Sequence, residues 1–269
     1  MAGDRNPSKK IQDLLKTVDM GRNLIYYRET GSTNEDAKAL AKSGAKHGTL
    51  VLAHWQKNGY GRRGRSWILN KGEGIAMTLI LRPEFEPKFA FLLTLVMAIS
   101  VARSMESLYG LEAKIKWPND IIIGRKKVCG ILTTMSADVT KIHYVLVGVG
   151  INCSVTVFPD ELKDRATSIQ LELGHRIQQE ELIARCMENF EADYETLIKT
   201  KDLSLLLEEY NRRLIHLNQR IRVLDGESSY EGISRGINSL GELLVTTKNG
   251  ETTTLHSGEI SIRGLHGYL

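Results

Sequence analysis

Apolar and polar positions along this chain follow the two periods of regular secondary structure, and they predict a protein that mixes helices and strands. Short apolar runs of β-prone composition predict strands at Leu24–Tyr27, Thr49–Trp55, Ile75–Leu81, Ile115–Trp117, Asp120–Ile123, Val128–Thr134 and Ile142–Asn152. Apolar residues at helical spacing predict helices at Phe89–Leu108, Glu180–Ile198 and Leu203–Ile215. The first of these helices is apolar nearly all round, so we expect it at the centre of the core.

The two ends of the chain have a different texture. Residues 1–23 are polar apart from a short amphipathic piece at Ile11–Leu15, which predicts a frayed helix or a linker. Beyond about Asn218, short β-prone runs alternate with turn signals at Asp225-Gly226, Asn238–Gly241 and Asn249-Gly250, the last of which suits a two-residue hairpin. We therefore predict a tail over residues 1–23, a main domain over 24–217 and a small β-barrel over 218–269.

A helix start is predicted at Ser32. Ser32 and Glu35 have the spacing of a capping box, ahead of a helix over Ala37–Lys42 that Gly44 would end. A serine that caps a helix needs no ligand. The free N–H groups and the dipole of the same helix start also suit an anion, so both interpretations stay open.

Composition limits the class of protein more than its function. With 269 residues, 42% hydrophobic and 25% charged, the chain suits a soluble globular protein, and its net charge of +4 does not imply a nucleic-acid partner. The start lacks the apolar core of a signal peptide, and the most apolar run, Phe89–Ala102, has 14 residues, too few to span a bilayer. Cys129, Cys153 and Cys186 lie far apart without metal-ligand spacing, so we expect a reducing cytoplasm.

Three arginines and three glycines interleave in the segment Gln56–Trp67, with no acidic residue among them. Glycine lets backbone approach a ligand closely, and arginine brings a planar fork of donors for phosphate or carboxylate. The segment therefore predicts a flexible cationic loop that closes over an anionic small molecule. Its glycines also spell a dinucleotide-binding fingerprint, but a strand rather than a helix follows, so that interpretation fails. A basic loop for nucleic acid remains an alternative.

The pentapeptide Lys116-Trp117-Pro118-Asn119-Asp120 is unusual. It follows the basic loop and precedes the strand end Gly148–Asn152, and in this order and spacing the three motifs resemble those of biotin–protein ligases. The resemblance covers roughly residues 24–269 and extends to three further segments, which are Ser32-Thr33-Asn34, Arg125–Leu132 and Ala166–Ile169.

The resemblance implies an α+β fold with a class II synthetase-like mixed sheet and a small C-terminal SH3-like β-barrel. It also implies an ATP-dependent ligase that uses Mg²⁺. The carboxylate of biotin attacks the α-phosphate of ATP to give biotinyl-5′-AMP, which a lysine of a biotin carboxyl carrier protein then attacks. Fixed positive charge should dominate such catalysis, and an ordered loop should exclude water. Relatives can pair through the main sheet, so a homodimer is an option, whereas neither DNA nor a membrane is an expected partner.

By resemblance, the biotin contacts are Ser32, Thr33, Asn34, Gln56, Gly59, Tyr60, Gly61, Arg62, Lys127 and Gly130. The contacts with ATP and the adenylate are Arg62, Arg65, Trp67, Lys116, Asn119 and Asn152. Catalytic roles fall to Arg62, which retains the intermediate, to Lys127 at the carboxylate and α-phosphate, and to Lys116 and Asp120 at the adenylate and the incoming lysine. Asn152 is also a candidate for the vicinity of Mg²⁺. The plainer alternatives are a solvated Lys127 and a turn residue at Asn152.

Two departures from the family pattern stand out. Tyr60 occupies a position where the family most often has arginine, so one cationic contact is missing. Many relatives also carry an N-terminal winged helix that binds an operator. Only 23 residues precede Leu24, fewer than a module of ~60 residues needs. We therefore predict no repressor function.

Two other functions compete with this prediction. A lipoate– or octanoate–protein ligase has the same fold and chemistry, but its basic-loop and Lys-Trp-Pro-Asn-Asp motifs differ. A nucleic-acid-binding regulator would use the arginine loop and would show steeply salt-dependent affinity. It would leave Lys116–Asp120 and Asn152 without a role, and stacking aromatics are scarce beside the arginines.

Overall fold

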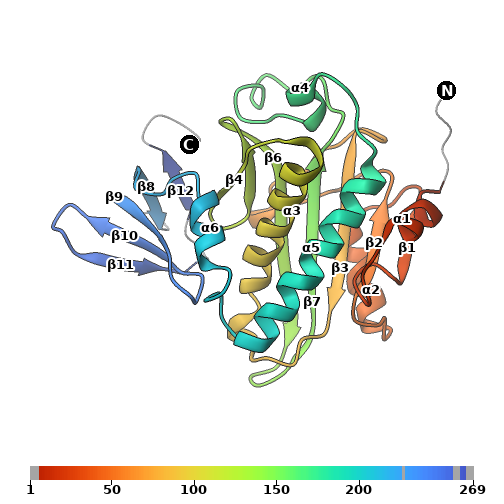
Figure 1. Ribbon diagram of the computed structural model, residues 1–269, viewed down its shortest axis with the longest axis horizontal. Helices are drawn as coiled ribbons and strands as arrows, with labels where there is room; N and C mark the ends of the chain where they lie inside the picture. Colours follow the sequence, from red (N-terminus) through yellow and green to blue (C-terminus); the bar gives the residue numbers. More distant parts are fainter. Residues whose placement is uncertain (1–5, 226–227, 257–260, 265–269) are drawn as a thin grey trace.

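The structure is a computed structural model that describes residues 6–225, 228–256 and 261–264. A large sheet with helices packed on it lies beside a smaller sheet (Figure 1). The helices are α1 (Ser8–Leu14), α2 (Thr33–Lys42), α3 (Leu92–Tyr109), α4 (Ile169–Leu173), α5 (Gln179–Thr200) and α6 (Leu207–Arg213). Single 3-10 turns lie at Arg62–Gly64 and Pro87–Phe89.

The large sheet has seven strands in the order β1-β2-β3-β7-β6-β5-β4. They are β1 (Leu24–Tyr27), β2 (Thr49–Ala53), β3 (Gly74–Leu81), β4 (Ala113–Lys116), β5 (Asp120–Ile123), β6 (Lys126–Ala137) and β7 (Ile142–Asn152). Strands β1 and β2 are parallel and the other neighbours are antiparallel, so the sheet is mixed. The predicted α+β fold class is confirmed, and β1 and β7 have the predicted bounds.

Helices α3 and α5 cover one face of this sheet (Figure 1). Every residue of α3 from Leu92 to Ala102 is buried, which confirms its predicted place at the centre of the core. The helical stretch Pro87–Tyr109 is in fact long and apolar enough to pass for a membrane span by length and composition. However, 78% of its most apolar window is buried inside the protein, which is the behaviour of a core helix.

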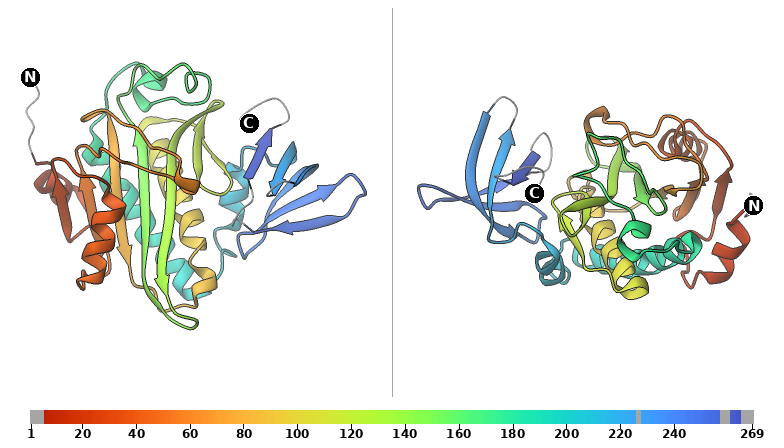
Figure 2. Two further views of the ribbon diagram at one scale, coloured as in Figure 1. Left: turned by 180° about the vertical axis from the view of Figure 1, so that it is seen from behind. Right: turned by 90° about the horizontal axis from the view of Figure 1, so that it is seen from above.

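Helix α2 covers part of the opposite face, which is turned toward the viewer in the left view of Figure 2. Side chains alternate across a strand, so Leu50 and Leu52 of β2 join the core around α3 while Val51 between them points the other way. Val51 packs in a second cluster with Ile80 and with Ala37 of α2. Helix α2 therefore has a fixed position, and its N-terminal end lies at the edge of the cavity described below.

Part of the N-terminal segment forms a helix, α1, where a frayed helix or a linker is predicted. Ile11 of α1 is fully buried, and Met20 is also in the core. The carboxylate of Glu191 in α5 accepts hydrogen bonds from the N–H groups of residues 18–20 at 2.8–2.9 Å. The few apolar positions of this segment are therefore enough to fasten it to α5.

Helix α6 is shorter than the predicted helix Leu203–Ile215. The N–H of Leu203 donates to the carbonyl of Ser239 at 2.8 Å, and the N–H of Ile215 donates to the carbonyl of Ile115 at 2.9 Å. Both ends of the apolar run therefore pair with other parts of the chain instead of continuing the helix. Helical spacing alone could not predict these long-range pairings.

The C-terminal region forms the smaller, antiparallel sheet, with strands in the order β11-β10-β9-β8-β12. The strands are β8 (Arg220–Asp225), β9 (Ser228–Ile237), β10 (Leu243–Thr247), β11 (Thr252–Leu255) and β12 (Ser261–Gly264). Asn249-Gly250 lies in the hairpin between β10 and β11, but the loop is longer than the predicted two-residue turn, because the N–H of Thr247 donates to the Glu251 carbonyl at 2.8 Å and leaves residues 248–250 as the connection. The predicted turn at Asp225-Gly226 falls partly outside the described residues.

The two sheets meet at Trp117 and His216. The indole N–H of Trp117 donates to the carbonyl of Gly241 at 3.1 Å, and its backbone N–H donates to His216 Nε2 at 3.3 Å. His216 Nδ1 lies 2.8 Å from Ser234 Oγ. Burial, and next the charge of Lys116, lowers the pKa of His216 to about 3. The imidazole is therefore neutral, as an acceptor at Nε2 must be.

Core packing around α3 gives a direct test of the fold. Met97 is fully buried in α3, whereas Met135 of β6 is 49% exposed. We expect Met97→Ala to lower the free energy of unfolding by about 2–5 kcal/mol, because it removes buried contacts and leaves a cavity. Met135→Ala, the matched control, should change it by less than about 0.5 kcal/mol. Urea denaturation followed by circular dichroism measures both, and equal effects would contradict the central position of α3.

Candidate active site

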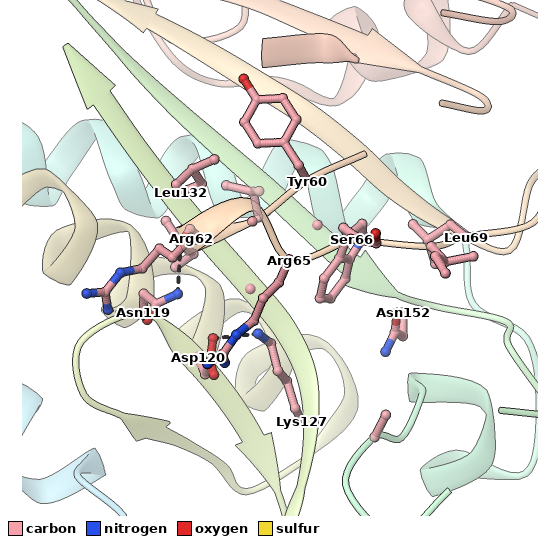
Figure 3. A pocket seen from close by; sticks show the side chains of 18 of the residues that line it. Tyr60, Arg62, Arg65, Ser66, Leu69, Asn119, Asp120, Lys127, Leu132 and Asn152 are labelled. Atoms are coloured by element: carbon pink, nitrogen blue, oxygen red, sulfur yellow. Dashed lines mark hydrogen bonds and ion pairs between the residues drawn. The ribbon is translucent and has the colours of Figure 1, made fainter. Parts of the chain in front are cut away.

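A cavity of about 850 Å³ opens where the loop after β2 lies over β6 and β7 (Figure 3). This volume is in the range of small-molecule sites. Its walls come from the start of α2, the basic loop, the β4–β5 turn, β6, β7 and residues 155–166. Ile262 and Arg263 of β12 also line it, so the smaller sheet contributes to the same cavity.

A buried polar network closes the end of the cavity next to α2. Thr78 of β3 is fully buried, and its hydroxyl lies 2.8 Å from Asn34 Oδ1 and 3.0 Å from Thr33 Oγ1. A Cβ atom at Gly148 would lie 2.4 Å from Asn34 Oδ1. Glycine at position 148 therefore leaves room for the Asn34 amide, and the Thr78 hydroxyl helps to fix the orientation of that amide.

The capping box predicted at Ser32 is wrong. Ser32 is the N-cap of α2, but its side chain makes no capping hydrogen bond. Gln56 Oε1 instead accepts from the N–H of Thr33 at 3.2 Å, and Glu35 accepts from the hydroxyl of Tyr60 at 2.6 Å. Ser32 Oγ is buried without a hydrogen-bond partner among the described residues. A buried, unsatisfied hydroxyl beside a cavity is well placed to bind a polar group of a ligand.

The basic loop folds as a tight hairpin over the cavity. Its backbone is joined by hydrogen bonds of 2.8 Å from Gly61 N–H to the Arg65 carbonyl and from Trp67 N–H to the Gly59 carbonyl. A guanidinium N–H of Arg62 donates to Asn119 Oδ1 at 3.1 Å. Burial is the largest cause that lowers the pKa of Arg62 from its ordinary value. The loop thus brings a partly desolvated cation to the β4–β5 turn (Figure 3).

The side chains of Trp67 and Lys127 pack directly against the backbone at Gly150 and Gly130. A Cβ atom at Gly150 would lie 2.5 Å from the Trp67 indole, and one at Gly130 would lie 3.0 Å from Lys127 Nζ. Lys127 Nζ is 5.4 Å from the centre of the Trp67 ring and 2.6 Å from Asp120 Oδ1. Larger residues in β6 and β7 would therefore displace both side chains. Trp67 Nε1 is buried with no hydrogen-bond partner in the described part of the chain.

Lys116 lies opposite Asp120 in the β4–β5 pair and is 5% exposed. Its pKa is lowered to about 7, first by burial and next by the charge of Arg263, while Asp120 acts in the opposite direction. A lysine in these surroundings gains a full charge most easily when an anion comes close. Lys116 is therefore suited to a phosphate or carboxylate ligand.

Asn152 lines the cavity at the end of β7, and its Nδ2 donates to the Thr167 carbonyl at 3.0 Å. The same segment pairs with Lys127, whose N–H donates to the Arg165 carbonyl at 2.8 Å. Among the described residues, no group of three or more His, Cys, Asp or Glu side chains could hold a metal ion. Val157, at the rim of the cavity, is 81% exposed.

All the predicted site residues except Ser32 and Gly59 line this one cavity, namely Thr33, Asn34, Gln56, Tyr60, Gly61, Arg62, Arg65, Trp67, Lys116, Asn119, Asp120, Lys127, Gly130 and Asn152. Ser32 adjoins Thr33, and Gly59 is packed so closely that a Cβ atom there would lie 2.4 Å from Gln56 Nε2. Sequence analysis did not find Thr78, which looks like any strand residue. It also did not find Arg263, which reaches the cavity only because the smaller sheet docks beside β4.

Comparisons with known proteins agree with this arrangement. The sequence matches the model of the biotin/lipoate A/B protein ligase family over residues 26–152 and that of the biotin protein ligase C-terminal domain over residues 216–263. It is 40% identical to the Bifunctional ligase/repressor BirA of Bacillus subtilis over 253 residues, which is 92% of this chain and 76% of the relative. It is 32% identical to the Biotin--[acetyl-CoA-carboxylase] ligase of Mycobacterium tuberculosis, over 94% of each chain.

A solved structure gives the same result. The biotin protein ligase from Aquifex aeolicus in complex with biotin and ATP superposes with a TM-score of 0.79 and 29% identity, over 90% of this chain and 99% of that chain. The matched cavity residues, the two matched family models and these relatives lead to one conclusion. The chain belongs to the biotin protein ligase family.

Proposed function

We propose that this chain is an ATP-dependent ligase that activates biotin to biotinyl-5′-AMP and transfers biotin to a lysine of a biotin carboxyl carrier domain of a carboxylase. The observation that carries the proposal is the convergence of Lys127, Lys116 and Arg62 on one cavity. The reaction joins a carboxylate to a triphosphate, so it needs positive charge fixed in place before the reactants meet. The named relatives support biotin rather than lipoate as the acid.

The end of the cavity next to α2 suits the polar ring system of biotin. The unsatisfied Ser32 hydroxyl, Thr33, Asn34 and Gln56 offer both donors and acceptors there. Backbone at Gly59 and Gly61 would pass close to the ligand, with Trp67 and Gly130 as the apolar wall. We propose that these residues bind biotin and direct its carboxylate toward Lys127.

Lys127 would then stabilise the negative charge on the biotin carboxylate and the α-phosphate as they meet. The biotin oxygen bonds to the α-phosphorus, the bond to the β-phosphate oxygen breaks, and pyrophosphate leaves. Arg62, Arg65 and Asn119 would hold the resulting adenylate, and Lys116 would neutralise phosphate charge. Proximity and electrostatics carry this step, and no enzyme nucleophile is needed.

In the second step the acceptor lysine loses a proton to solvent and its neutral amine attacks the carbonyl of the mixed anhydride. The C–N bond forms, the bond from the carbonyl carbon to the phosphate oxygen breaks, AMP leaves, and the proton released from the nitrogen passes to solvent. Asp120 would accept a hydrogen bond from the incoming ammonium group and help to bring it to the carbonyl. The Asp120 carboxylate already pairs with Lys127 at 2.6 Å, so it faces the reacting atoms. The hairpin of the basic loop would keep water from the anhydride until the acceptor arrives.

Mg²⁺ binds ATP phosphates and usually keeps several of its waters, so it needs few protein ligands. The residues present fit such an ion, because Asn152 offers its amide oxygen while its Nδ2 is bonded to Thr167. When bound, the ion would supply charge neutralisation on the phosphates. The absence of a carboxylate cluster among the described residues agrees with an ion that arrives with the nucleotide.

Several wider expectations remain proposals. We propose that residues 24–217 are the catalytic domain and residues 218–269 an SH3-like domain, which the match of the C-terminal model to residues 216–263 supports. A homodimer and a cytoplasmic location stay predictions from the sequence, as does the expectation that the chain binds no DNA.

The proposed function is tested by biotin-dependent release of pyrophosphate from Mg-ATP, with lipoate and octanoate assayed in parallel. We expect release with biotin and subsequent transfer to a lysine of a carrier domain. Release with lipoate instead would make the chain a lipoate ligase. No release with any of the three acids would contradict the proposal.

Lys127→Ala should separate the catalytic lysine from its neighbours. We expect the rate of adenylate formation to fall about 100- to 1,000-fold, as when one oxyanion-stabilising donor is removed. Lys126→Ala is the matched control, because the Lys126 side chain donates to the Lys163 carbonyl and does not line the cavity. Single-turnover adenylation measures both rates. An unchanged rate in Lys127→Ala would remove Lys127 from the reaction.

The low pKa of Lys116 predicts that nucleotide binding takes up a proton. Its pKa in the free protein is about 7, and a bound triphosphate should raise it. The favourable interaction between charged Lys116 and the triphosphate is therefore fully present below about pH 7. It is lost as the pH rises through the higher pKa that Lys116 has in the complex. Over this range the affinity for the nucleotide falls by up to about tenfold per pH unit. Calorimetry at pH 8 with biotin and a non-hydrolysable ATP analogue, in two buffers of different ionisation enthalpy, should detect the uptake.

Lys116→Met provides the comparison for this measurement. Methionine fills a similar volume but carries no charge, so proton uptake at pH 8 should disappear while the fold is kept. Uptake that is the same in both proteins would assign the proton to another group.

A further inference from the structure

The hairpin of the basic loop is fastened to α2 at two places. At its base, Gln56 binds the N–H of Thr33, and the N–H of Lys57 donates to the Thr30 carbonyl at 2.9 Å. Farther along the hairpin, Tyr60 Oη donates to Glu35 Oε1 at 2.6 Å. The base contact holds the start of the loop, whereas the second contact lies only two residues before Arg62.

Tyr60 faces away from the charged residues of the site. Figure 3 shows its ring pointing away from Arg62, Asp120 and Lys127. Tyr60 also pairs with Ser66 across the hairpin in an antiparallel bridge. A side chain fixed at this position therefore restrains both arms of the hairpin together.

The donor in this contact stays protonated. Burial, and next the hydrogen bond and charge of Glu35, raises the pKa of Tyr60 to about 12. Glu35 lies in the first turn of α2, where the helix dipole favours a carboxylate. The same residue was expected to close a capping box, but its carboxylate accepts from Tyr60 instead.

We propose that Tyr60 is a positioning residue that latches the basic loop to α2 through Glu35, and so holds Arg62 at Asn119 over the cavity. In this way the chain replaces a cationic contact, expected where the family has arginine, with a hydrogen bond from a neutral hydroxyl of the loop to a carboxylate of the helix. The latch fastens the loop before any ligand is bound. Its effect on the adenylate rests on the proposed function, whereas its effect on the loop does not.

The first test needs no ligand. The hairpin offers trypsin three arginines, and cleavage of a folded loop depends on how often it opens. We expect Tyr60→Phe and Glu35→Ala each to speed initial cleavage at residues 62–65 by about threefold to tenfold, the effect of one hydrogen bond. Because both changes remove the same contact, the double variant should be no faster than either single one. Glu35→Gln keeps an acceptor oxygen and should stay close to the wild-type rate.

Two controls separate the latch from general loosening of α2. Tyr27→Phe removes the hydroxyl of a β1 tyrosine that packs against the α2 cluster. Lys38→Ala removes a charged neighbour of Glu35, since Lys38 Nζ lies 4.0 Å from Glu35 Oε2. Both should leave cleavage at residues 62–65 unchanged. Equal cleavage of the wild type and Tyr60→Phe, or additive effects in the double variant, would overturn the proposal.

The second test measures function. In Tyr60→Phe we expect biotinyl-5′-AMP to dissociate about threefold to tenfold faster, while the single-turnover rate of its formation changes less than its release. A wild type that forms no adenylate would refute the proposed function, and the ligand-free cleavage would still test the latch. Adenylate that forms normally and leaves both proteins at one rate would overturn the role of Tyr60 in retention.

Discussion

Several basic side chains face one cavity in this protein. Their positions depend on the ends of several strands. Lys116, Lys127 and Arg62 come from three separate segments, and burial favours loss of a proton from Lys116 and Arg62. Asp120 offsets part of the repulsion, since it pairs with Lys127 and lies opposite Lys116. The fold has therefore placed these basic groups before a ligand arrives, so an entering anion meets a site that needs little reorganisation and completes the charge of Lys116.

The firmly packed strands under the cavity make this arrangement possible. Strands β3, β7 and β6 pair over long antiparallel stretches, and their inner face packs on the apolar helix α3. Glycines at positions 130, 148 and 150 then let Lys127, Asn34 and Trp67 lie directly on the backbone. The stability gained from burying α3 offsets the cost of gathering like charges and unsatisfied polar groups at the other side of the sheet.

Sequence analysis predicted the features that depend on local pattern. It missed those that depend on contacts between distant segments of the chain. The bounds of β1 and β7 and the central place of α3 follow from apolar periodicity, and the site residues gather because their motifs lie at strand ends on one edge of the sheet. The capping prediction at Ser32 failed because the Ser32 side chain makes no capping hydrogen bond and the Glu35 carboxylate accepts from Tyr60, which is distant in sequence. Arg263 was missed because no local pattern shows that β12 reaches the cavity. The helix at Leu203–Ile215 was too long because its ends pair with other segments.

The parts of the site differ in how firmly they are held, and this difference shows which part can open. The segment after β4 is clamped by Trp117, whose indole and backbone bind Gly241 and His216, and Lys127 is pinned by backbone pairing with residues 165–167. Residues 61–68 of the basic loop are exposed or half-buried, and side chains such as Gln56 and Tyr60 fasten the loop to α2. Hydrogen bonds near the surface open at lower cost than a packed core. Retention and release of a reactive intermediate should therefore be controlled at the loop, while the packed strands under the cavity keep the charges in place.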